Sequence, residues 1–307
     1  MQFELSDAIG APVREMAPLA EYTTIRIGGP ARYLCVARTA EQVVRALEIA
    51  RSKSLRCQVL GLGSNVLFSD EGFDGLVVIF RAAAVEVDGS TIWAEGGASY
   101  SRIVELAARH GLAGLSFAAG IPGTVGGALH GNAGAFGEAI GDRLKEAVLI
   151  APDGHGRRRV SAEELELDYR VSSLSSTGEV VESVTLSLEP GDRAAIWAEV
   201  EDHLEHRRRR LPPQSLPSAG SFFKNLPPPA PGEMRVAAGK LLDECGCKGL
   251  RVGDAQVYEK HANIIINLGH ATAKQVLTLA EEMQRRVRDT YSLQLVPEIK
   301  IFPHSRV

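Results

Sequence analysis

Several features are scarce or absent in this sequence of 307 residues. It has only four cysteines, which are too few and too scattered for a disulfide framework, and Cys245-Gly-Cys247 alone is not a zinc-binding spacing. No apolar run typical of a signal peptide follows Met1, so we expect a reduced, cytoplasmic location. With a formal net charge of −4 and a pI of about 6.1, the chain is not expected to bind nucleic acid.

Motifs of several enzyme classes are also missing. No Gly-x-Ser-x-Gly sequence occurs, which disfavours an α/β-hydrolase. The Gly61–Asn65 loop is no complete dinucleotide fingerprint, and it is no P-loop because no Gly-Lys-Ser/Thr follows it. Two interpretations of this loop stay open. It is either a plain tight turn or a set of N–H groups that, with the side chains of Ser64 and Asn65, suits a pyrophosphate.

Charged side chains are absent where glycine is most abundant. Residues 110–137 contain no Asp, Glu, Lys or Arg, and residues 111–141 hold ten of the 31 glycines. Because glycine costs roughly 0.5–1 kcal/mol relative to alanine in regular structure, such a run needs a reason. Its glycines, Pro122 and Asn132 make a membrane span a poor interpretation. The run predicts either a tightly wound structural loop or backbone N–H groups that contact a large, partly anionic cofactor.

Hydrophobic periodicity predicts an α+β chain, and the length suggests two or three domains. Capping boxes are expected at Thr39 with Gln42 and at Thr272 with Gln275. Asp88-Gly89 and Asp153-Gly154 predict hairpin turns. Helices are expected after Thr39, at 99–110, 193–210 and 236–245 and after Thr272, and strands at 32–36, 58–60, 76–80, 85–87, 91–94, 147–150, 180–188, 262–267 and 295–302.

Polar residues that could carry chemistry lie in separate segments. Arg170, in Asp168-Tyr-Arg170, is either half of a surface pair or a fork for a carboxylate. Ser221 is either structural or a proton donor. Glu298 is either an exposed residue or one set by strand alternation on the face opposite Ile299 and Ile301. The basic run at 207–210 suits the end of a helix and could also anchor an anionic ligand.

Eight motifs occur in the order found in one family. They are TTIRIGGPA (23–31), LGLGSN (60–65), AGIPGTVGGA (119–128), NAGAFG (132–137), LDYR (167–170), AGSFFKN (219–225), KHANIIIN (260–267) and PE (297–298). Each motif is weak alone, but together and at these spacings they are specific. The chain therefore resembles the UDP-N-acetylenolpyruvoylglucosamine reductases (MurB), flavoenzymes of bacterial cell-wall synthesis. Without a long insertion after Arg170, it is similar to the shorter, second subtype.

The resemblance implies a fold and a domain division. The fold is α+β, with an FAD-binding fold of the PCMH/vanillyl-alcohol-oxidase type made of two α/β lobes, and a smaller α/β substrate-binding domain. The first lobe is expected at 1–81, joined by a C-terminal strand within 291–307. The second lobe is expected at 82–211 and includes the glycine run, and the substrate-binding domain is expected at 212–290.

The resemblance also implies the reaction. Non-covalently bound FAD takes a hydride from NADPH and passes it to the enolpyruvyl group of UDP-N-acetylglucosamine enolpyruvate, which gives UDP-N-acetylmuramate for peptidoglycan. Ser221 is implied as the proton donor, and Arg170 and Glu298 as the groups that stabilise the enolate-like charge, with Glu298 protonated or hydrogen-bonded. The partners are then NADPH and the nucleotide sugar, with no nucleic acid and no membrane, and we expect a cytoplasmic monomer without a metal.

Binding residues carry over from the same motifs. For FAD, the resemblance implies Arg26, Gly61, Gly63, Ser64, Asn65, Ala119, Gly120, Ile121, Pro122, Gly123, Thr124, Gly126, Gly127, Asn132, Ala133 and Gly134. For the substrate, it implies Tyr169, Arg210, Lys224, Asn225, His261 and Asn263. The sequence departs from the family pattern at Tyr22, His130 and Leu226, which bears on the loops around the substrate more than on the activity.

Two rival functions remain. One is an oxygen-using flavin oxidase with a covalently linked histidine, but the Gly61–Asn65 loop contains no His. The other is a flavin or nucleotide-sugar binding protein without catalysis. The presence of Ser221, Arg170 and Glu298 together argues against that second interpretation.

Overall fold

The computed structural model describes residues 1–213 and 215–302. The chain folds into two compact units, and each is described by itself. Unit 1 and unit 2 are both built from more than one stretch of the sequence. Unit 1 comprises residues 1–17, 32–62 and 74–207, and unit 2 comprises residues 18–31, 63–73 and 208–307.

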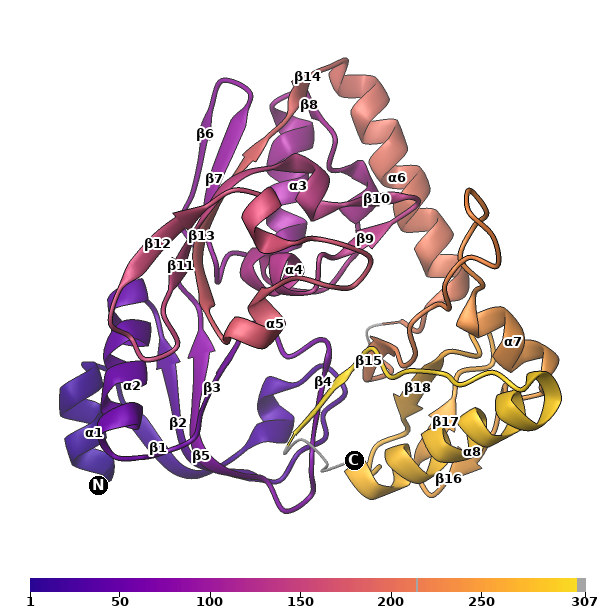
Figure 1. Ribbon diagram of the computed structural model, residues 1–307, viewed down its shortest axis with the longest axis horizontal. Helices are drawn as coiled ribbons and strands as arrows, with labels where there is room; N and C mark the ends of the chain where they lie inside the picture. Colours follow the sequence, from indigo (N-terminus) through magenta and orange to yellow (C-terminus); the bar gives the residue numbers. More distant parts are fainter. Residues whose placement is uncertain (214, 303–307) are drawn as a thin grey trace. The chain divides into compact units, whose positions relative to one another are not determined.

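A four-stranded sheet forms one end of unit 1. Its strand order is β1 (Val13–Pro18), β2 (Pro30–Ala37), β5 (Phe73–Phe80) and β3 (Cys57–Leu60). β3 and β5 run parallel, as expected for strands joined by a crossover. Helices α1 (Gln2–Ile9) and α2 (Ala40–Ser52) lie side by side against this sheet (Figure 1). Val43 and Leu47 of α2 are buried there, as their spacing predicts.

The N-terminus of α2 departs slightly from the expected capping box. Thr39 Oγ1 accepts a hydrogen bond from the Gln42 N–H at 3.2 Å, so the cap itself is confirmed. The Gln42 side chain, however, accepts from the N–H of Arg38 at 2.7 Å instead of that of Thr39. The start of the helix is fixed either way, because both orphan donors find acceptors.

A five-stranded antiparallel sheet makes up the centre of unit 1. Its order is β12 (Arg157–Val160), β11 (Leu144–Ile150), β13 (Val180–Ser187), β7 (Thr91–Glu95) and β6 (Val85–Asp88). Helices α3 (Tyr100–Arg109) and α4 (Val125–His130) pack against β7 and β13 (Figure 1). Tyr100, Phe117 and Leu149 are fully buried in the core that results. The glycine run thus lies in the layer that covers this sheet.

The β6–β7 hairpin corrects one expectation. Asp88 pairs with Thr91, so the two loop residues are Gly89 and Ser90, and the expected turn at Asp88-Gly89 is wrong by one residue. Gly89 has a φ of +54°, which is the conformation that such short hairpin loops require. The prediction missed because strand pairing, and not the dipeptide alone, sets the register.

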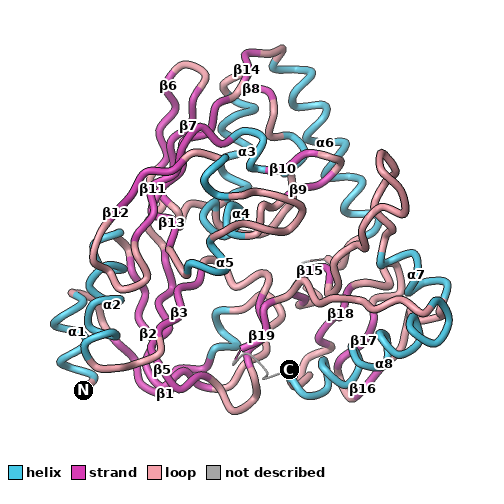
Figure 2. Tube along the Cα trace, in the orientation of Figure 1, coloured by secondary structure: helices cyan, strands magenta, loops and turns pink. Residues whose placement is uncertain are grey.

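The rest of unit 1 consists of short elements and one long helix. Figure 2 shows that the segment between α3 and β11 consists of short helices and strands joined by loops. Asp192 caps the long helix, since its Oδ1 accepts from the Ala195 N–H at 2.7 Å. The elements are β8 (Leu112–Ala113), η2 (Ser116–Ala118), β9 (Gly134–Ala135), β10 (Glu138–Ala139), η3 (Ile140–Arg143), η4 (Glu163–Leu165), α5 (Leu174–Thr177), β14 (Glu189–Pro190) and α6 (Arg193–Arg210).

Unit 2 is built around a small antiparallel sheet. Its order is β15 (Ser218–Ser221), β18 (Ile264–Asn267), β17 (Ala255–Val257) and β16 (Arg251–Val252). Helices α7 (Ala238–Glu244) and α8 (Ala273–Tyr291) pack on one another, and α8 also packs on β16 and β17. The 3-10 turn η1 (Leu19–Tyr22) and the parallel pair β4 (Val66–Phe68) and β19 (Lys300–Phe302) complete the unit.

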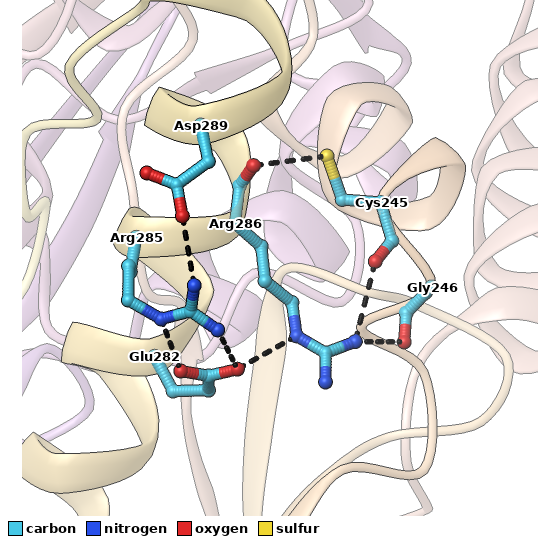
Figure 3. A network of polar contacts seen from close by, with 6 residues as sticks. All are labelled: Cys245, Gly246, Glu282, Arg285, Arg286 and Asp289. Carbon is cyan, nitrogen blue, oxygen red and sulfur yellow. Dashed lines mark hydrogen bonds and ion pairs between the residues drawn. The ribbon is translucent and has the colours of Figure 1, made fainter.

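Helix α8 is held by a polar network at its C-terminal half. Arg286 Nε donates to Glu282 at 2.8 Å, and its Nη1 donates to the Gly246 carbonyl at 3.1 Å (Figure 3). Arg285 also bonds to Glu282 and to Asp289. At the other end of α8, Thr272 and Gln275 form the predicted capping box with both bonds present. Each basic group drawn in Figure 3 therefore has an acceptor.

Two boundary predictions for unit 2 need correction. The helix expected at 236–245 spans Ala238–Glu244, because Asn225 Oδ1 accepts from the N–H of Ala238 and caps it there. The strand expected at 295–302 spans only Lys300–Phe302, since Glu298 and Pro297 lie beside 222–223 and not beside β4. Residue 214, in the expected substrate-binding domain, and the end of the expected C-terminal strand, 303–307, lie outside the described residues.

Candidate functional site

Several glycines of the run are required by the protein itself. A Cβ on Gly126 would lie 2.8 Å from the carbonyl oxygen of Gly96, and one on Gly134 would collide with the carbonyl of Glu138. Gly111 and Gly120 have φ values of +66° and +75°, which side chains disfavour. The structural part of the prediction is thus correct for these positions, and the glycine count alone says little about a ligand.

Gly127 is different, because no structural constraint demands glycine there. A Cβ on it would meet Thr124 Oγ1 at 3.4 Å, an ordinary van der Waals contact, and its φ is not positive. Gly127 is also exposed, in the first turn of α4. Thr124 Oγ1 caps this turn by accepting from the Gly127 N–H at 3.2 Å. Among the residues that the structure describes, the N–H groups of Gly123 and Thr124 have no acceptor.

This corner therefore fits a flat anionic cofactor. It offers free N–H groups and one exposed glycine without a side chain, where a bulky neighbour could approach closely. Of the predicted cofactor residues in the run, Ala119, Thr124, Gly126 and Asn132 are buried, whereas Gly120, Pro122 and Gly127 are exposed and Ile121, Gly123, Ala133 and Gly134 are half-buried.

The Gly61–Asn65 loop is tightly packed at both of its glycines. In unit 1, a Cβ on Gly61 would collide with Thr124 Oγ1, and the Gly61 carbonyl accepts from Arg81 at 2.8 Å. In unit 2, Gly63 has a φ of +67°, and a Cβ on it would collide with the Tyr22 carbonyl. Both glycines thus have structural reasons. Because Gly61 packs against Thr124, the Gly61–Asn65 loop and the glycine run, which are separate in the sequence, lie side by side at this point.

In unit 2, the loop also supports the segment that carries Glu298. Asn65 Nδ2 donates to the Glu298 carbonyl at 3.3 Å, and the Asn65 carbonyl accepts from the Lys300 N–H at 3.0 Å. Thr24 donates through its hydroxyl to the Ser218 carbonyl at 2.7 Å and through its N–H to Gly63 at 3.0 Å. The exposed Arg26, with a φ of +55°, follows in the same loop.

Arg170 is fastened to the glycine run within unit 1. Its Nη2 donates to the Gly134 carbonyl at 3.1 Å. Two further bonds hold the loop around it: Asn132 Nδ2 to the Asp168 carbonyl at 3.0 Å, and Ser172 Oγ to the His130 carbonyl at 2.6 Å. Arg170 has a φ of +56°, which is uncommon for a side chain of its size. Asn132, predicted as a cofactor contact, therefore also positions the Arg170 loop.

A second arginine lies near Arg170. Burial, followed by the positive charge of Arg170, lowers the pKa of Arg207 on α6. Arg207 lies over the ring of Phe136, with 5.9 Å between the guanidinium carbon and the ring centroid, and Arg170 lies over Tyr169 at 5.6 Å. Phe136 in turn stacks on His203 at 4.1 Å. Two cations and an aromatic cluster thus border the glycine run.

Ser221 and Glu298 are brought together within unit 2. Ser221 ends β15 after Gly220, whose φ is +76°, and it is half-buried. The Glu298 N–H donates to the carbonyl of Phe222 at 2.7 Å, and the Lys224 N–H donates to Val296 at 2.9 Å. The segment before β19 therefore runs beside the segment after Ser221. Arg170 belongs to unit 1, so the meeting of all three groups stays a prediction.

The predicted substrate residues of unit 2 occupy two kinds of position. Asn263 is buried, and its amide bonds to both the N–H and the carbonyl of Phe223, at 2.9 and 2.8 Å. Asn225 caps α7. The Nδ1 atom of His261 accepts from the Asn263 N–H at 3.3 Å. Burial, and then the charge of Arg210, lowers the pKa of His261, which places exposed Arg210 near that ring.

Other features of the described residues point to no additional chemistry. A cavity of about 420 Å³ in unit 1 is lined by Glu138, Asp142, Arg143, Glu189 and Glu199, and none of the predicted site residues lines it. Among the described residues, no group of His, Cys, Asp or Glu side chains could hold a metal ion. No helix in that part of the chain combines the length and the apolar character that crossing a membrane would need.

Comparison with known proteins decides the family. The chain is 43% identical to UDP-N-acetylenolpyruvoylglucosamine reductase 2 of Symbiobacterium thermophilum, over 95% of this chain and 93% of that one. It is 41% identical to the reductase of Moorella thermoacetica, over 97% and 96%. The chain belongs to the UDP-N-acetylenolpyruvoylglucosamine reductase family. The resemblance inferred from eight motifs is thereby confirmed.

The fold agrees with that of the UDP-N-acetylenolpyruvoylglucosamine reductases. The crystal structure of the Thermus caldophilus reductase superposes with a TM-score of 0.79 at 35% identity, over 95% of this chain and all of that one. Residues 212–302 match the family model of the C-terminal domain of these reductases, and residues 31–158 match the model of an FAD binding domain. The predicted α+β chain with an FAD-binding fold is confirmed.

Two cations that lie near predicted site residues, Arg207 and Lys300, are not among the residues predicted from the sequence. Arg207 was grouped with a basic helix end, and its position in the run did not distinguish it from its exposed neighbours. Lys300 was not considered. Burial, and then the charge of Lys224, lowers the pKa of Lys300, so these two lysines lie near one another. A signal existed for Lys300, because it follows Glu298 by two residues, but none existed for Arg207.

Proposed function

We propose that the chain is an FAD- and NADPH-dependent oxidoreductase. It reduces the enolpyruvyl group of UDP-N-acetylglucosamine enolpyruvate and gives UDP-N-acetylmuramate, a peptidoglycan precursor. The observation that carries this proposal is the uncharged corner at Gly123–Gly127, with its free N–H groups and with the Arg170 loop bonded beside it at Gly134. The enzyme acts as a cytoplasmic monomer and needs neither nucleic acid nor membrane.

FAD fits the corner described above and, when bound, supplies the redox chemistry by carrying a hydride from NADPH to the enolpyruvyl double bond. We propose that the backbone of 119–127 and 132–134, with Gly61, Gly63, Ser64, Asn65 and Arg26, holds it non-covalently. Thr124 keeps the first turn of α4 in place, because its hydroxyl caps that turn and its side chain fills the space above Gly61. The absence of charge there leaves N–H groups as the donors to phosphate.

Ser221 donates the proton to the carbon next to the carboxylate. A serine hydroxyl is a weak acid, so negative charge must develop beside it before the proton moves. The hydroxyl of Ser221 is half-buried and bonds to no described residue, which leaves it available to a substrate atom. Asn263 positions this segment through both backbone groups of Phe223, and so acts on the reaction through Ser221.

Arg170 and Glu298 stabilise the negative charge that spreads into the substrate carboxylate. A guanidinium fork favours this charge in the transition state more than in the ground state, which is what accelerates a reaction. Glu298 acts as a protonated or hydrogen-bonded group, because a bare carboxylate would repel the charge. We propose that Lys224, Asn225 and Arg210 bind the diphosphate, and that Tyr169, His261 and Asn263 complete the substrate-binding residues.

We further propose the domain division expected from the sequence. Residues 1–81, with the C-terminal strand, and residues 82–211 are the two lobes that bind FAD, and residues 212–290 bind the nucleotide sugar. The family model of the C-terminal domain matches residues 212–302, which supports residue 212 as the start of the substrate-binding domain. The functional boundary at Leu211 follows directly after α6.

Substitution of Ser221 tests the function. Ser221→Ala is expected to keep bound FAD and its reduction by NADPH, and to lose about 10²–10⁴-fold in turnover with the enolpyruvyl nucleotide sugar. Ser218→Ala, on the same strand, is the matched control and is expected to turn over like the wild type. Turnover of Ser221→Ala at the wild-type rate would contradict the role of proton donor. A wild-type protein that oxidises NADPH no faster when the nucleotide sugar is added would contradict the function.

A further inference from the structure

Arg207 is a cation for which the described residues provide no counter-ion. Its Nε is buried and has no acceptor, and among the described residues no carboxylate pairs with its guanidinium. The three arginines that follow it on α6 and at its end, Arg208 to Arg210, are exposed. Leaving a charged donor buried and unbonded costs more than leaving it in water. A fold that keeps this arrangement needs a partner that the chain itself does not provide.

The side chain of Arg207 is also held in position. A Cβ on Gly120 would lie 2.9 Å from Arg207 Cδ and 3.1 Å from Leu204 Cδ2, so the stem packs directly on the glycine run. On another side, the guanidinium lies over the ring of Phe136, with the carbon 5.9 Å from the centroid. The ring of His203 stacks on the ring of Phe136, and the Nδ1 atom of His203 bonds to the Ser116 carbonyl at 2.9 Å. An arginine that merely snorkels to water would not be confined in this way.

Arg170 is a charged group that acts on Arg207, second to burial in its effect on the Arg207 pKa. Its positive charge lowers the pKa of Arg207, so the two guanidinium groups repel one another. Arg170 is itself anchored on Gly134, in the same glycine run that supports Arg207 at Gly120. Two like charges, partly shielded from water and both aimed at one uncharged segment, are stabilised when an anion lies between them.

We propose that Arg207 is a further ligand-binding arginine, which together with Arg170 holds an oxyanion of a substrate of the reaction. This inference rests on the proposed function, because it takes Arg170 to be part of the active site. The oxyanion is a carboxylate or a phosphate. Both chemistries accept paired hydrogen bonds from guanidinium groups, and the nucleotide sugar and NADPH each carry at least one such group.

Equilibrium titrations without turnover test the proposal. The FAD-loaded wild type, Arg207→Met, Arg207→Lys and Arg209→Met are titrated with UDP-N-acetylmuramate, UDP-N-acetylglucosamine, NADP⁺ and NAD⁺ by the change in flavin absorbance. Arg207→Met is expected to raise Kd at least about tenfold for the ligand whose oxyanion it holds, since charge-assisted bonds are lost. Arg207→Lys should recover part of this loss, and the exposed control Arg209→Met should bind like the wild type.

The four ligands separate the sources of the oxyanion. An effect on UDP-N-acetylmuramate but not on UDP-N-acetylglucosamine identifies the carboxylate, and an equal effect on both identifies the diphosphate. An effect on NADP⁺ without one on NAD⁺ identifies the additional phosphate of the coenzyme. Wild-type Kd values for every ligand in Arg207→Met would overturn the proposal.

Loss of FAD from both Arg207 variants would also overturn it, because the anion would then belong to the cofactor. Failure of the proposed function looks different: the wild type itself would not reduce the enolpyruvyl nucleotide sugar. In that case the titrations still show whether Arg207 binds an oxyanion.

Discussion

Two arginines on long helices make a useful comparison. Arg286, on α8 in unit 2, donates to the Glu282 carboxylate and to the carbonyls of Cys245 and Gly246, so its charge and its N–H groups serve the fold (Figure 3). Arg207, on α6 in unit 1, has a buried Nε without an acceptor and the like charge of Arg170 nearby. An arginine that stabilises the fold is satisfied by the chain, and one that binds a ligand is left incomplete.

The same contrast separates two adjacent glycines of α4. Gly126 is required by the backbone of Gly96, which lies too close for a side chain. Gly127 faces solvent and has room for one. The glycine run thus combines positions where the fold requires glycine with at least one position, Gly127, where the fold leaves room for a side chain. The predictions below probe this division, from the largest expected effect to the smallest.

The largest effect is expected for Gly126→Ala against Gly127→Ala. Gly126→Ala forces a methyl group to 2.8 Å from the Gly96 carbonyl oxygen, and such overpacking costs about 1–3 kcal/mol or more. Gly127→Ala should leave the apoprotein as stable as the wild type, or more stable by up to about 1 kcal/mol, because alanine favours the helix. It should nevertheless weaken FAD binding. Urea unfolding measures the stability of the two apoproteins, and FAD titration measures their affinity for the cofactor. If Gly127→Ala bound FAD as tightly as the wild type, Gly127 would not be a position kept for the cofactor.

The next effect concerns the two arginines themselves. Arg286→Met leaves Glu282 and the carbonyls of Cys245 and Gly246, which directly follow α7, with fewer donors, and it should lower the free energy of unfolding by about 1–2 kcal/mol. Arg207→Met removes a buried, unbonded charge and should leave the apoprotein unchanged or stabilise it. Thermal unfolding of both apo variants measures this. Destabilisation by Arg207→Met to the extent seen for Arg286→Met would show that Arg207 also serves the fold.

A smaller effect is expected for His261. Burial and then the charges of Arg210 and Lys248 lower its pKa below the ordinary 6.5, and a backbone hydrogen bond and the nearby charge of Asp243 oppose this only in part. The unfolded chain therefore binds more protons, so the stabilisation is complete above pH 6.5 and is lost as the pH falls below that value. His261→Asn should reduce the slope of stability against pH between about 5 and 7. If urea unfolding gives the same slope of stability against pH for the wild type and for His261→Asn, the conclusion that the folded protein keeps His261 neutral, with Nδ1 as an acceptor, is contradicted.

The smallest effect belongs to Glu282. Hydrogen bonds from Arg285 and Arg286 lower its pKa from 4.5 to about 2, but the network is open to solvent. Its stabilisation is present above pH 4.5 and disappears as the pH falls toward 2. Glu282→Gln should therefore flatten the acid side of the stability profile by a small amount, since exposed ion pairs contribute little. If Glu282→Gln lost stability in acid to the same extent as the wild type, the stabilisation by this network would come from the bonds of Arg286 to the Cys245 and Gly246 carbonyls alone.

Local sequence signals predicted the fold well where short-range physics decides it. Thr272 and Gln275 form the expected capping box, and the helix expected at 193–210 spans Arg193–Arg210. Where pairing with a distant segment decides, the predictions failed: the hairpin turn moved to Gly89-Ser90, and Glu298 lies outside β19. Propensity describes a residue and its neighbours, and it contains no information on which strand will lie beside it.

By itself, the sequence determined the family, the α+β fold and the candidate residues Ser221, Arg170 and Glu298, because the motifs that carry them are continuous in the chain. Only the tertiary structure decided that Gly126 is structural and Gly127 is not, and that one arginine of four in a row is half-buried with its Nε shielded from water. Burial and missing partners are properties of segments that meet in space. A linear pattern specifies which donors exist, and packing decides which of them are left without an acceptor.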